Sequence, residues 1–242
     1  MLTGWNLVIA AEWHMKFAVF GAAGATGREI VMQAAARGHA VCAIDRQLPR
    51  NTFAGDVECH EADLLSGALE PAIARCDAVL NAAGLPLSLS TALAPPPLYT
   101  EGTIRLIHAM RQAGVSRLVA ISASFVASRD RGPLWFRAAA GLALDRIFAQ
   151  MAEMERLLAV AEDVDWTSVR PGWLMHGPLT NDYTVTPNVI PRGMLRTRHT
   201  DLARFMLDCA ELGDWTKGTP AIARHEPAAA ASPAAALQEL LG

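Results

Sequence analysis

Short apolar runs and helical patterns alternate along most of this chain. Strands are predicted near 17–21, 40–45, 56–60, 77–82, 117–122 and 165–170, and helices over 25–37, 66–75, 98–113 and 138–161. After Pro171 the alternation is lost until Thr200-Asp201, where a polar residue can begin a helix through Leu202. We therefore expect an α/β protein with an irregular segment over 172–199.

The strands read as continuous apolar runs rather than as alternating ones, for example Arg117-Leu118-Val119-Ala120-Ile121. Such runs indicate parallel strands that are buried on both faces. Right-handed crossovers then predict a Rossmann-like, doubly wound parallel sheet, with a ligand crevice at the carboxyl ends of its strands. The chain has 242 residues, of which 52% are hydrophobic, so we expect a single domain over 15–225. Within this domain, segment 172–199 is expected to cover the substrate.

The two ends of the chain lie outside this domain. Residues 1–14 lack the basic stretch of a secretory signal and precede Met15-Lys16, so we interpret them as an N-terminal extension ahead of the native start. Residues 226–242 form a tail rich in alanine and proline, in which Ser232-Pro233 could begin a short helix. We assign neither end a function.

Three glycines follow the first strand, at Gly21, Gly24 and Gly27. Residues without a Cβ allow a sharp turn, let a pyrophosphate approach the peptide N–H groups and let helix and strand pack closely. Asp45 ends the next strand, about 20 residues on, where a ribose hydroxyl would be held. The loop therefore predicts dinucleotide binding, through Gly21, Ala23, Gly24, Ala25, Thr26 and Gly27.

The sequence of this loop, GAAGATG, resembles the short-chain dehydrogenase/reductase superfamily. Later motifs, Asn81-Ala82-Ala83-Gly84, Ser122-Ala123-Ser124 and Val169-Arg170-Pro171-Gly172, are similar to its atypical NAD(P)H-binding branch. Residues 177–186, GPLTNDYTVT, resemble a stretch of the flavin reductases called biliverdin reductase B. The resemblance spans about residues 16–210 and implies a nicotinamide cofactor.

Asp45 and Arg46 favour different cofactors. A carboxylate accepts hydrogen bonds from the ribose diol of NAD, whereas an arginine pairs with the 2′-phosphate of NADP. The resemblance covers Arg46 but not Asp45, and we expect NADP or NAD with a slight preference for NADP.

The resemblance also implies further cofactor contacts at the ends of the later strands. Asp63 and Leu64 lie where the family contacts adenine, although Asp63 could equally cap a helix. The remaining contacts implied are Asn81, Ala82, Ala83, Gly84, Ser122 and Pro171.

The usual catalytic pair of short-chain dehydrogenases is absent. They use Tyr-x-x-x-Lys to pass a proton to or from a substrate oxygen. Here Tyr99 and Tyr183 are followed four residues later by Thr103 and Pro187, and the only lysines are Lys16 and Lys217. Alcohol–ketone chemistry through that relay is therefore excluded.

Hydride transfer to a planar acceptor such as flavin or quinone needs less help, because the acceptor itself takes up the electrons. Ser122 and Ser124 are candidate hydroxyl donors and Trp173 a candidate stacking partner, with Phe125, Trp135 and Phe136 as further aromatic candidates that could instead pack in the core. The alternative is a non-catalytic redox sensor resembling the NmrA group. Arg192, Arg196 and Arg198 could steer an anionic acceptor or simply be solvated.

Other functions find little support. The net charge of −3 argues against nucleic-acid binding. The sequence also contains no run of 18 apolar residues, the length needed to span a membrane. The four cysteines form no C-x-x-C motif, which fits buried thiols in the cytoplasm. The seven histidines show no close ligand spacing and no serine lies in a G-x-S-x-G motif, so neither a metal site nor a hydrolase is predicted.

Overall fold

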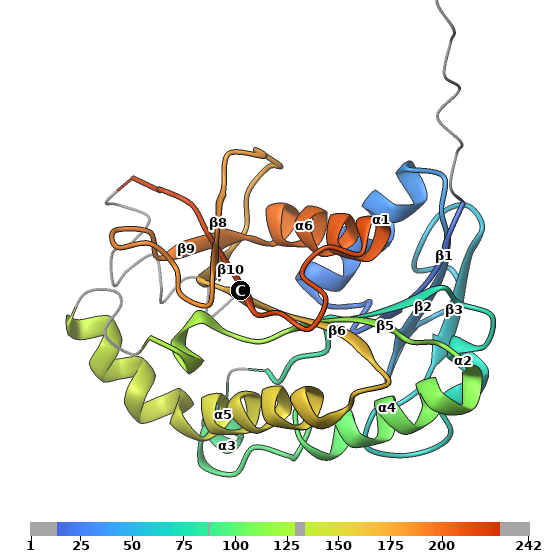
Figure 1. The fold of residues 1–242 in the computed structure, drawn as a ribbon, viewed down its shortest axis with the longest axis horizontal. Coiled ribbons are helices and arrows are strands. Elements are labelled where there is room, and N and C mark those ends of the chain that lie inside the picture. Colours follow the sequence, from blue (N-terminus) through green and yellow to red (C-terminus); the bar gives the residue numbers. More distant parts are fainter. Residues whose placement is uncertain (1–13, 87, 129–133, 228–242) are drawn as a thin grey trace, which may run out of the picture.

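The computed structural model describes residues 14–86, 88–128 and 134–227, and its centre is a mostly parallel eight-stranded sheet (Figure 1). The strands are β1 (Lys16–Phe20), β2 (Ala40–Asp45), β3 (Val57–Glu61), β4 (Ala78–Asn81), β5 (Arg117–Ile121), β6 (Asp165–Pro171), β8 (Thr184–Pro187) and β10 (Pro220–Ala223). Their order is β3-β2-β1-β4-β5-β6-β10-β8. The first six strands thus follow the doubly wound order in which the chain reverses direction between β1 and β4.

Helices cover both faces of this sheet (Figure 1). On one face lie α1 (Ala25–Ala36) and α6 (His199–Leu212), which pack against each other. On the other face lie α2 (Glu70–Ile73), α3 (Leu89–Leu93), α4 (Glu101–Ala113) and α5 (Leu134–Val160). A short 3₁₀ turn, η1 (Ser124–Val126), follows β5, and β7 (Trp173–Met175) pairs with β9 (Arg196–Arg198) in a small second sheet.

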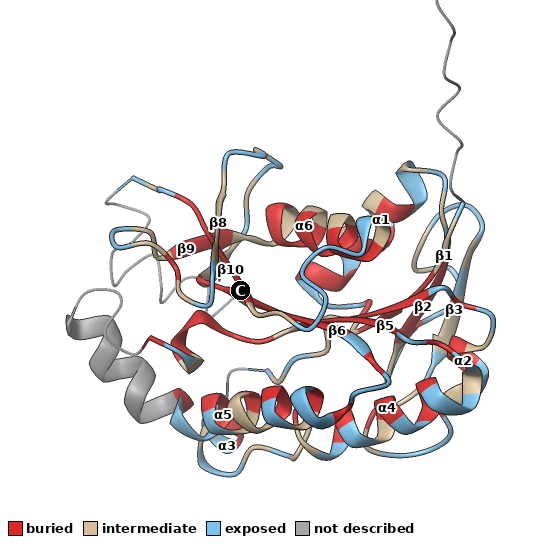
Figure 2. Ribbon diagram, in the orientation of Figure 1, coloured by how far each residue is buried: buried red, intermediate tan, exposed pale blue. Residues whose placement is uncertain are grey.

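The sheet separates two hydrophobic clusters, as the buried strands between helices in Figure 2 show. Alternate side chains of β1 point to opposite faces, so Phe17 packs with Ile30 and Met206 under α1 and α6, whereas Phe20 packs with Leu106 on the α4 side. Both phenylalanines are at most 1% exposed. Burial on both faces explains why these strands are apolar throughout.

The predicted doubly wound α/β architecture is confirmed, and the six strands expected before Pro171 all form, each within two residues of its expected bounds. The first helix ends as expected, because Gly38 follows it with a φ of 84° that favours glycine. Helix 138–161 begins earlier than expected, at Leu134, and helix 98–113 begins three residues later, at Glu101.

The helix expected over 66–75 is the least accurate of these predictions, since only Glu70–Ile73 is helical. Gly67 before it has a φ of 72° and Arg75 after it a φ of 63°, both outside the right-handed helical region. Pro71 stands in its first turn, the one place where a helix tolerates proline well. The apolar spacing here therefore reflects packing of a short turn.

The expectation of an irregular segment after Pro171 is also corrected. Strands β7, β8 and β9 all fall within 172–199, and β10 follows α6. β10 pairs parallel to β6 and antiparallel to β8, which extends the main sheet by two strands. Each of these strands has only three or four residues, too few to show a period.

Candidate functional site

The glycine loop between β1 and α1 is packed so closely that two of its glycines have no room for a side chain. A Cβ on Gly21 would lie 2.5 Å from the backbone nitrogen of Ala83, and one on Gly27 would lie 2.0 Å from the carbonyl oxygen of Gly21. Gly21 also has a φ of 73°. The loop thus brings β1, β4 and α1 together at the point where the strand order reverses.

This loop leaves the amino end of α1 open to an anion. Gly24 is its N-cap residue, no side chain caps the helix, and no acidic residue lies in the first turn. The first N–H groups of a helix have no partner within the helix, and its dipole places partial positive charge there. These amides suit the diphosphate of a dinucleotide, as the glycine pattern predicts.

Asp45, at the end of β2, is fixed against the glycine loop. Its Oδ2 accepts a hydrogen bond from the Ala23 backbone N–H at 3.0 Å, and its Oδ1 accepts one from the Arg46 N–H at 2.7 Å. The Arg46 side chain is exposed. The carboxylate is therefore held in place while the guanidinium is free to reorient, so the structure leaves both cofactor interpretations open.

A cavity of about 330 Å³ lies beside Asp45, at the carboxyl ends of β1, β2 and β4. This volume is near the lower end of the range for small-molecule sites, about 300–1,000 Å³. Among the residues predicted to bind cofactor, its lining contains Gly21, Gly24, Asp45, Arg46, Asp63, Leu64, Ala82, Ala83 and Gly84. These positions were assigned to the adenine, its ribose, the diphosphate and, at Ala82, Ala83 and Gly84, the ribose and nicotinamide.

Other lining residues were not predicted. They are Phe20, Ile44, Ala62, Leu65, Leu85, Pro86, Thr91, Pro96 and Leu98. The signal for several of them was present in the sequence, because Leu85-Pro86 directly follows the Asn81–Gly84 motif and a proline run stands at 95–97. Such a run fixes the backbone of a connecting loop, which here forms one wall of the cavity.

Several predicted site residues do not line this cavity, namely Ala23, Ala25, Thr26, Gly27, Asn81, Ser122, Ser124, Pro171 and Trp173. Asn81 instead accepts a hydrogen bond from the Ala83 N–H at 3.1 Å and so shapes the loop after β4. Ser122 and Ser124 are almost fully buried, and neither hydroxyl has a hydrogen-bond partner among the described residues. Unpaired buried hydroxyls are costly, and a bound group that reached them would remove that cost.

Asp63 does not cap a helix. Its Oδ1 accepts a hydrogen bond from the Leu65 N–H at 2.9 Å, while the Ser66 N–H donates to its carbonyl at 3.1 Å, so it stabilises a turn. The helix alternative fails because α2 begins only at Glu70. Asp63 lines the cavity, as the adenine assignment requires.

Sequence reasoning missed a contact between the glycine loop and α6. The Thr26 hydroxyl lies 2.7 Å from Nδ1 of His199, the first residue of α6. Burial lowers the pKa of His199 to about 4, with further contributions from the neighbouring charges of His176 and Arg196. The His176 ring lies close, with its centroid 5.0 Å from that of His199. His199 is therefore neutral near pH 7.

The aromatic candidates lie in different surroundings. Trp173 is partly buried on β7 beside the core cluster under α5. Phe125 is 6% exposed and packs against Phe148, with ring centroids 5.6 Å apart. This contact fits packing in the core rather than stacking against an acceptor. The side chains of Trp135 and Phe136 lie outside the described residues.

Segment 172–199 is tied to the rest of the fold by polar contacts. Asp201, fully buried in the first turn of α6, accepts hydrogen bonds from the N–H groups of Thr180 and Asn181 at 2.8 and 3.2 Å. Arg224 pairs with Asp182 at 2.8 Å.

Of the three arginines that were candidates for steering, two are held by the fold and the third is exposed. Arg198 pairs with Glu226 at 2.9 Å, Arg196 is 3% exposed on β9, and Arg192 is exposed to solvent. Arg192 thus fits the solvated alternative, whereas Arg196 and Arg198 do not.

The structure agrees with the absence of a tyrosine–lysine relay. Lys16 pairs with Glu58, and Lys217 donates to the Glu162 carbonyl. Burial raises the pKa of Tyr99 to about 12, so this phenol keeps its proton near neutral pH. Neither tyrosine therefore supports a Tyr-x-x-x-Lys mechanism.

One protein family and several known proteins are similar to this chain. A family profile described as NAD(P)H-binding matches residues 21–212. The photosystem II assembly factor Ycf39 of Synechocystis sp. is 32% identical over 131 residues, which are 50% of this chain and 37% of that protein. The chain thus matches little more than a third of the length of this curated relative.

Two solved structures share the fold. A candidate NADH-flavin reductase from Streptococcus pneumoniae TIGR4 has a TM-score of 0.68 and 22% identity, covering 87% of this chain and 99% of that one. A short-chain dehydrogenase/reductase from Veillonella parvula DSM 2008 in complex with NADP has a TM-score of 0.69 and 14% identity, covering 88% and 95%. At these identities the likeness establishes the architecture alone.

In the described part of the chain, no helix combines the length and the apolar character needed to cross a bilayer. The profile match covers most of the chain and begins at Gly21, the first glycine of the loop that the geometry assigns to a diphosphate. The protein belongs to the NAD(P)H-binding family.

Proposed function

We propose that the protein is an NAD(P)H-dependent oxidoreductase that passes hydride to a planar acceptor such as a flavin or a quinone. The observation that carries the proposal is the juxtaposition of the closely packed glycine loop, the uncapped start of α1 and the cavity beside Asp45. Together they fit the adenosine and diphosphate parts of a dinucleotide.

Different residues are proposed to contact different parts of the dinucleotide. Gly21 and Gly24 let the backbone approach the diphosphate, Asp45 or Arg46 contacts the adenosine ribose, and Asp63 faces the adenine. When bound, the reduced nicotinamide supplies a hydride. Ser122 and Ser124, beyond the end of β5, are the hydroxyl groups that we assign to the nicotinamide and acceptor.

The acceptor class follows from the chemistry that the chain lacks. A carbonyl substrate needs a proton delivered to its oxygen, and neither tyrosine has a lysine partner. A flavin or quinone accepts electrons into a conjugated ring and takes its protons through water. Trp173, partly exposed on β7, is the side chain that we propose stacks against such a ring.

The test follows loss of reduced-nicotinamide absorbance with NADH and NADPH against FMN, a quinone and a set of small aldehydes. We expect turnover with at least one planar acceptor and none with aldehydes. Replacing Trp173 with alanine should raise KM for that acceptor and leave cofactor affinity unchanged. Turnover of aldehydes alone would contradict the proposal.

A redox sensor of the NmrA type is the second candidate, because it requires no proton relay. Cofactor binding measured by nicotinamide fluorescence separates the two functions. Tight binding without turnover of any acceptor would favour the sensor, whereas absence of binding would contradict both.

A further inference from the structure

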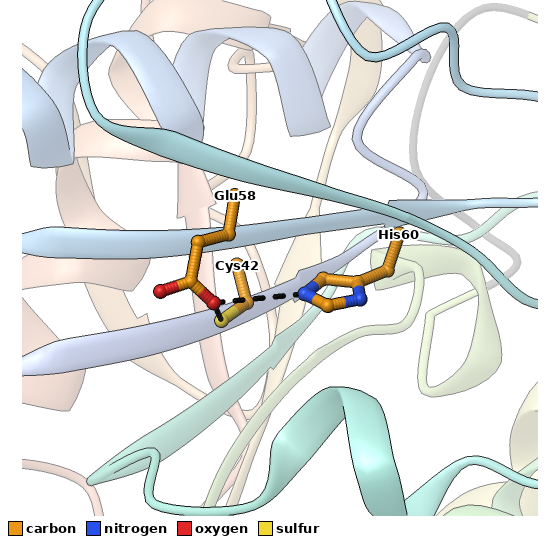
Figure 3. A group of neighbouring side chains, drawn as sticks. All are labelled: Cys42, Glu58 and His60. Atoms are coloured by element: carbon orange, nitrogen blue, oxygen red, sulfur yellow. Dashed lines mark hydrogen bonds and ion pairs between the residues drawn. The ribbon is translucent and has the colours of Figure 1, made fainter.

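A second group of chemically reactive side chains lies on the sheet face that α2 and α4 cover. Cys42 on β2 stands directly opposite Glu58 on β3, and His60 follows two residues later on the same face of β3 (Figure 3). Cys42 is buried, His60 partly buried and Glu58 exposed. None of the three lines the nucleotide cavity.

The ligand atoms of these residues converge. Cys42 Sγ lies 3.3 Å from Glu58 Oε2, and His60 Nε2 lies 3.7 Å from the same oxygen. Zinc binds sulfur at about 2.3 Å and nitrogen or oxygen at about 2.0–2.2 Å, so two ligands of a tetrahedral site are roughly 3.4–3.6 Å apart. The observed separations lie close to those edges, and all three ligand atoms lie within 4.8 Å of one another.

We propose that Cys42, His60 and Glu58 form a zinc-type metal site, separate from the nucleotide site. A thiolate, an imidazole and a carboxylate are a ligand set that suits zinc, with solvent at the fourth position. One thiolate and one carboxylate balance the two positive charges of the ion. Lys16 Nζ, 2.9 Å from Glu58 Oε1, holds that carboxylate from outside the ligand set.

The site would hold an edge strand to the sheet. β3 has no fully buried residue and forms one edge of the main sheet. A metal that joins β3 to β2 stabilises the folded state alone, because the ligands come together only on folding. Ligand spacing in the sequence could not reveal it, since two separate segments contribute.

The test uses full-length protein reduced with a phosphine, whose four thiols are first counted chemically. Cobalt(II) is added, and the thiolate-to-cobalt absorption and visible ligand-field bands are recorded and then competed with zinc. We expect one ion per chain, and a melting temperature raised by roughly 5–10 °C at zinc a hundred-fold above Kd. Cys42→Ser and His60→Ala should each lose at least ten-fold in affinity.

Cys59→Ser is the matched control, because Cys59 lies between two of the ligands on β3 but packs toward the opposite face. It should keep full cobalt absorption. Lack of thiolate–cobalt bands in the reduced wild-type protein would overturn the proposal, as would equal loss in Cys59→Ser. Full absorption in Cys42→Ser would likewise overturn it.

Discussion

The Thr26 hydroxyl lies 2.7 Å from Nδ1 of His199 and so joins the first turn of α1 to the first residue of α6. The two residues are 173 positions apart in the sequence. Since Thr26 lies within the GAAGATG motif, this hydrogen bond ties the proposed diphosphate site to the helix that begins at the end of segment 172–199.

His199 should make stability depend on pH. Its pKa is about 4 in the folded protein against about 6.5 in the unfolded chain, so protonation favours unfolding. Its contribution is complete above pH 6.5 and is lost as pH falls toward 4. We expect the free energy of unfolding of wild type, relative to His199→Gln, to fall by on the order of 2 kcal/mol across this window. Urea unfolding at several pH values measures it, and parallel profiles of the two proteins would contradict it.

Gly21→Ala should abolish cofactor binding and destabilise the fold, because its Cβ would lie 2.5 Å from the Ala83 backbone nitrogen. Gly55→Ala is the matched control: Gly55 also has a positive φ, of 77°, but no atom lies within 4 Å of its added Cβ. The control should lose only about 1–2 kcal/mol, the cost of the backbone conformation, and keep full affinity. Fluorescence titration and thermal melting report the two effects, and equal losses would contradict the assignment.

Cofactor choice should respond to Asp45 and Arg46 in opposite directions. Asp45→Asn keeps a hydrogen-bond acceptor for the Ala23 N–H but removes a charge that would repel a 2′-phosphate, so affinity for NADPH should rise about ten-fold. Arg46→Ala should weaken NADPH and leave NADH almost unchanged. Binding constants for both cofactors decide the matter, and equal weakening of the two by Arg46→Ala would contradict its role.

The ion pair between Arg170 and Glu155 should be important for stability. The guanidinium donates to both carboxylate oxygens, at 2.9 and 2.6 Å, and the side chains are only 12% and 10% exposed. Arg170→Met leaves a buried carboxylate without its partner and should cost about 3–5 kcal/mol.

Arg111 and Asp163 form a pair of the same two-bond geometry, but their side chains are 51% and 53% exposed. Arg111→Met should therefore cost far less stability than Arg170→Met, because solvent screens an exposed ion pair. Chemical unfolding of the two variants compares them directly, and similar losses would show that burial is not the deciding factor.

The sequence allowed the sheet to be predicted wherever a strand was long enough to form an apolar run. The prediction of a long helix at α2 was wrong, because Gly67 and Pro71 limit the helix to four residues although the apolar spacing was correct. The prediction after Pro171 was also wrong, because β10 is defined by its pairing with β6 and β8, which are distant in the sequence.

Several residues that line the cavity beside Asp45 were predicted as site residues, since they follow strands whose ends meet at one edge of the sheet. His199 was not, because nothing near it in the sequence marks a contact with Thr26. For Phe125 the position after β5 fits an acceptor site, but the ring packs against Phe148 instead. Which way a side chain faces after a strand ends is set by its tertiary neighbours.

The two outer strands of the main sheet, β3 and β8, bear on self-association. An unpaired edge is a template for another chain, and charged residues or proline discourage such pairing. β3 carries Glu58 and Glu61, and β8 ends in Pro187. Replacing both glutamates with valine would leave a strand suited to intermolecular pairing, and light scattering should then detect aggregation that the native edge resists.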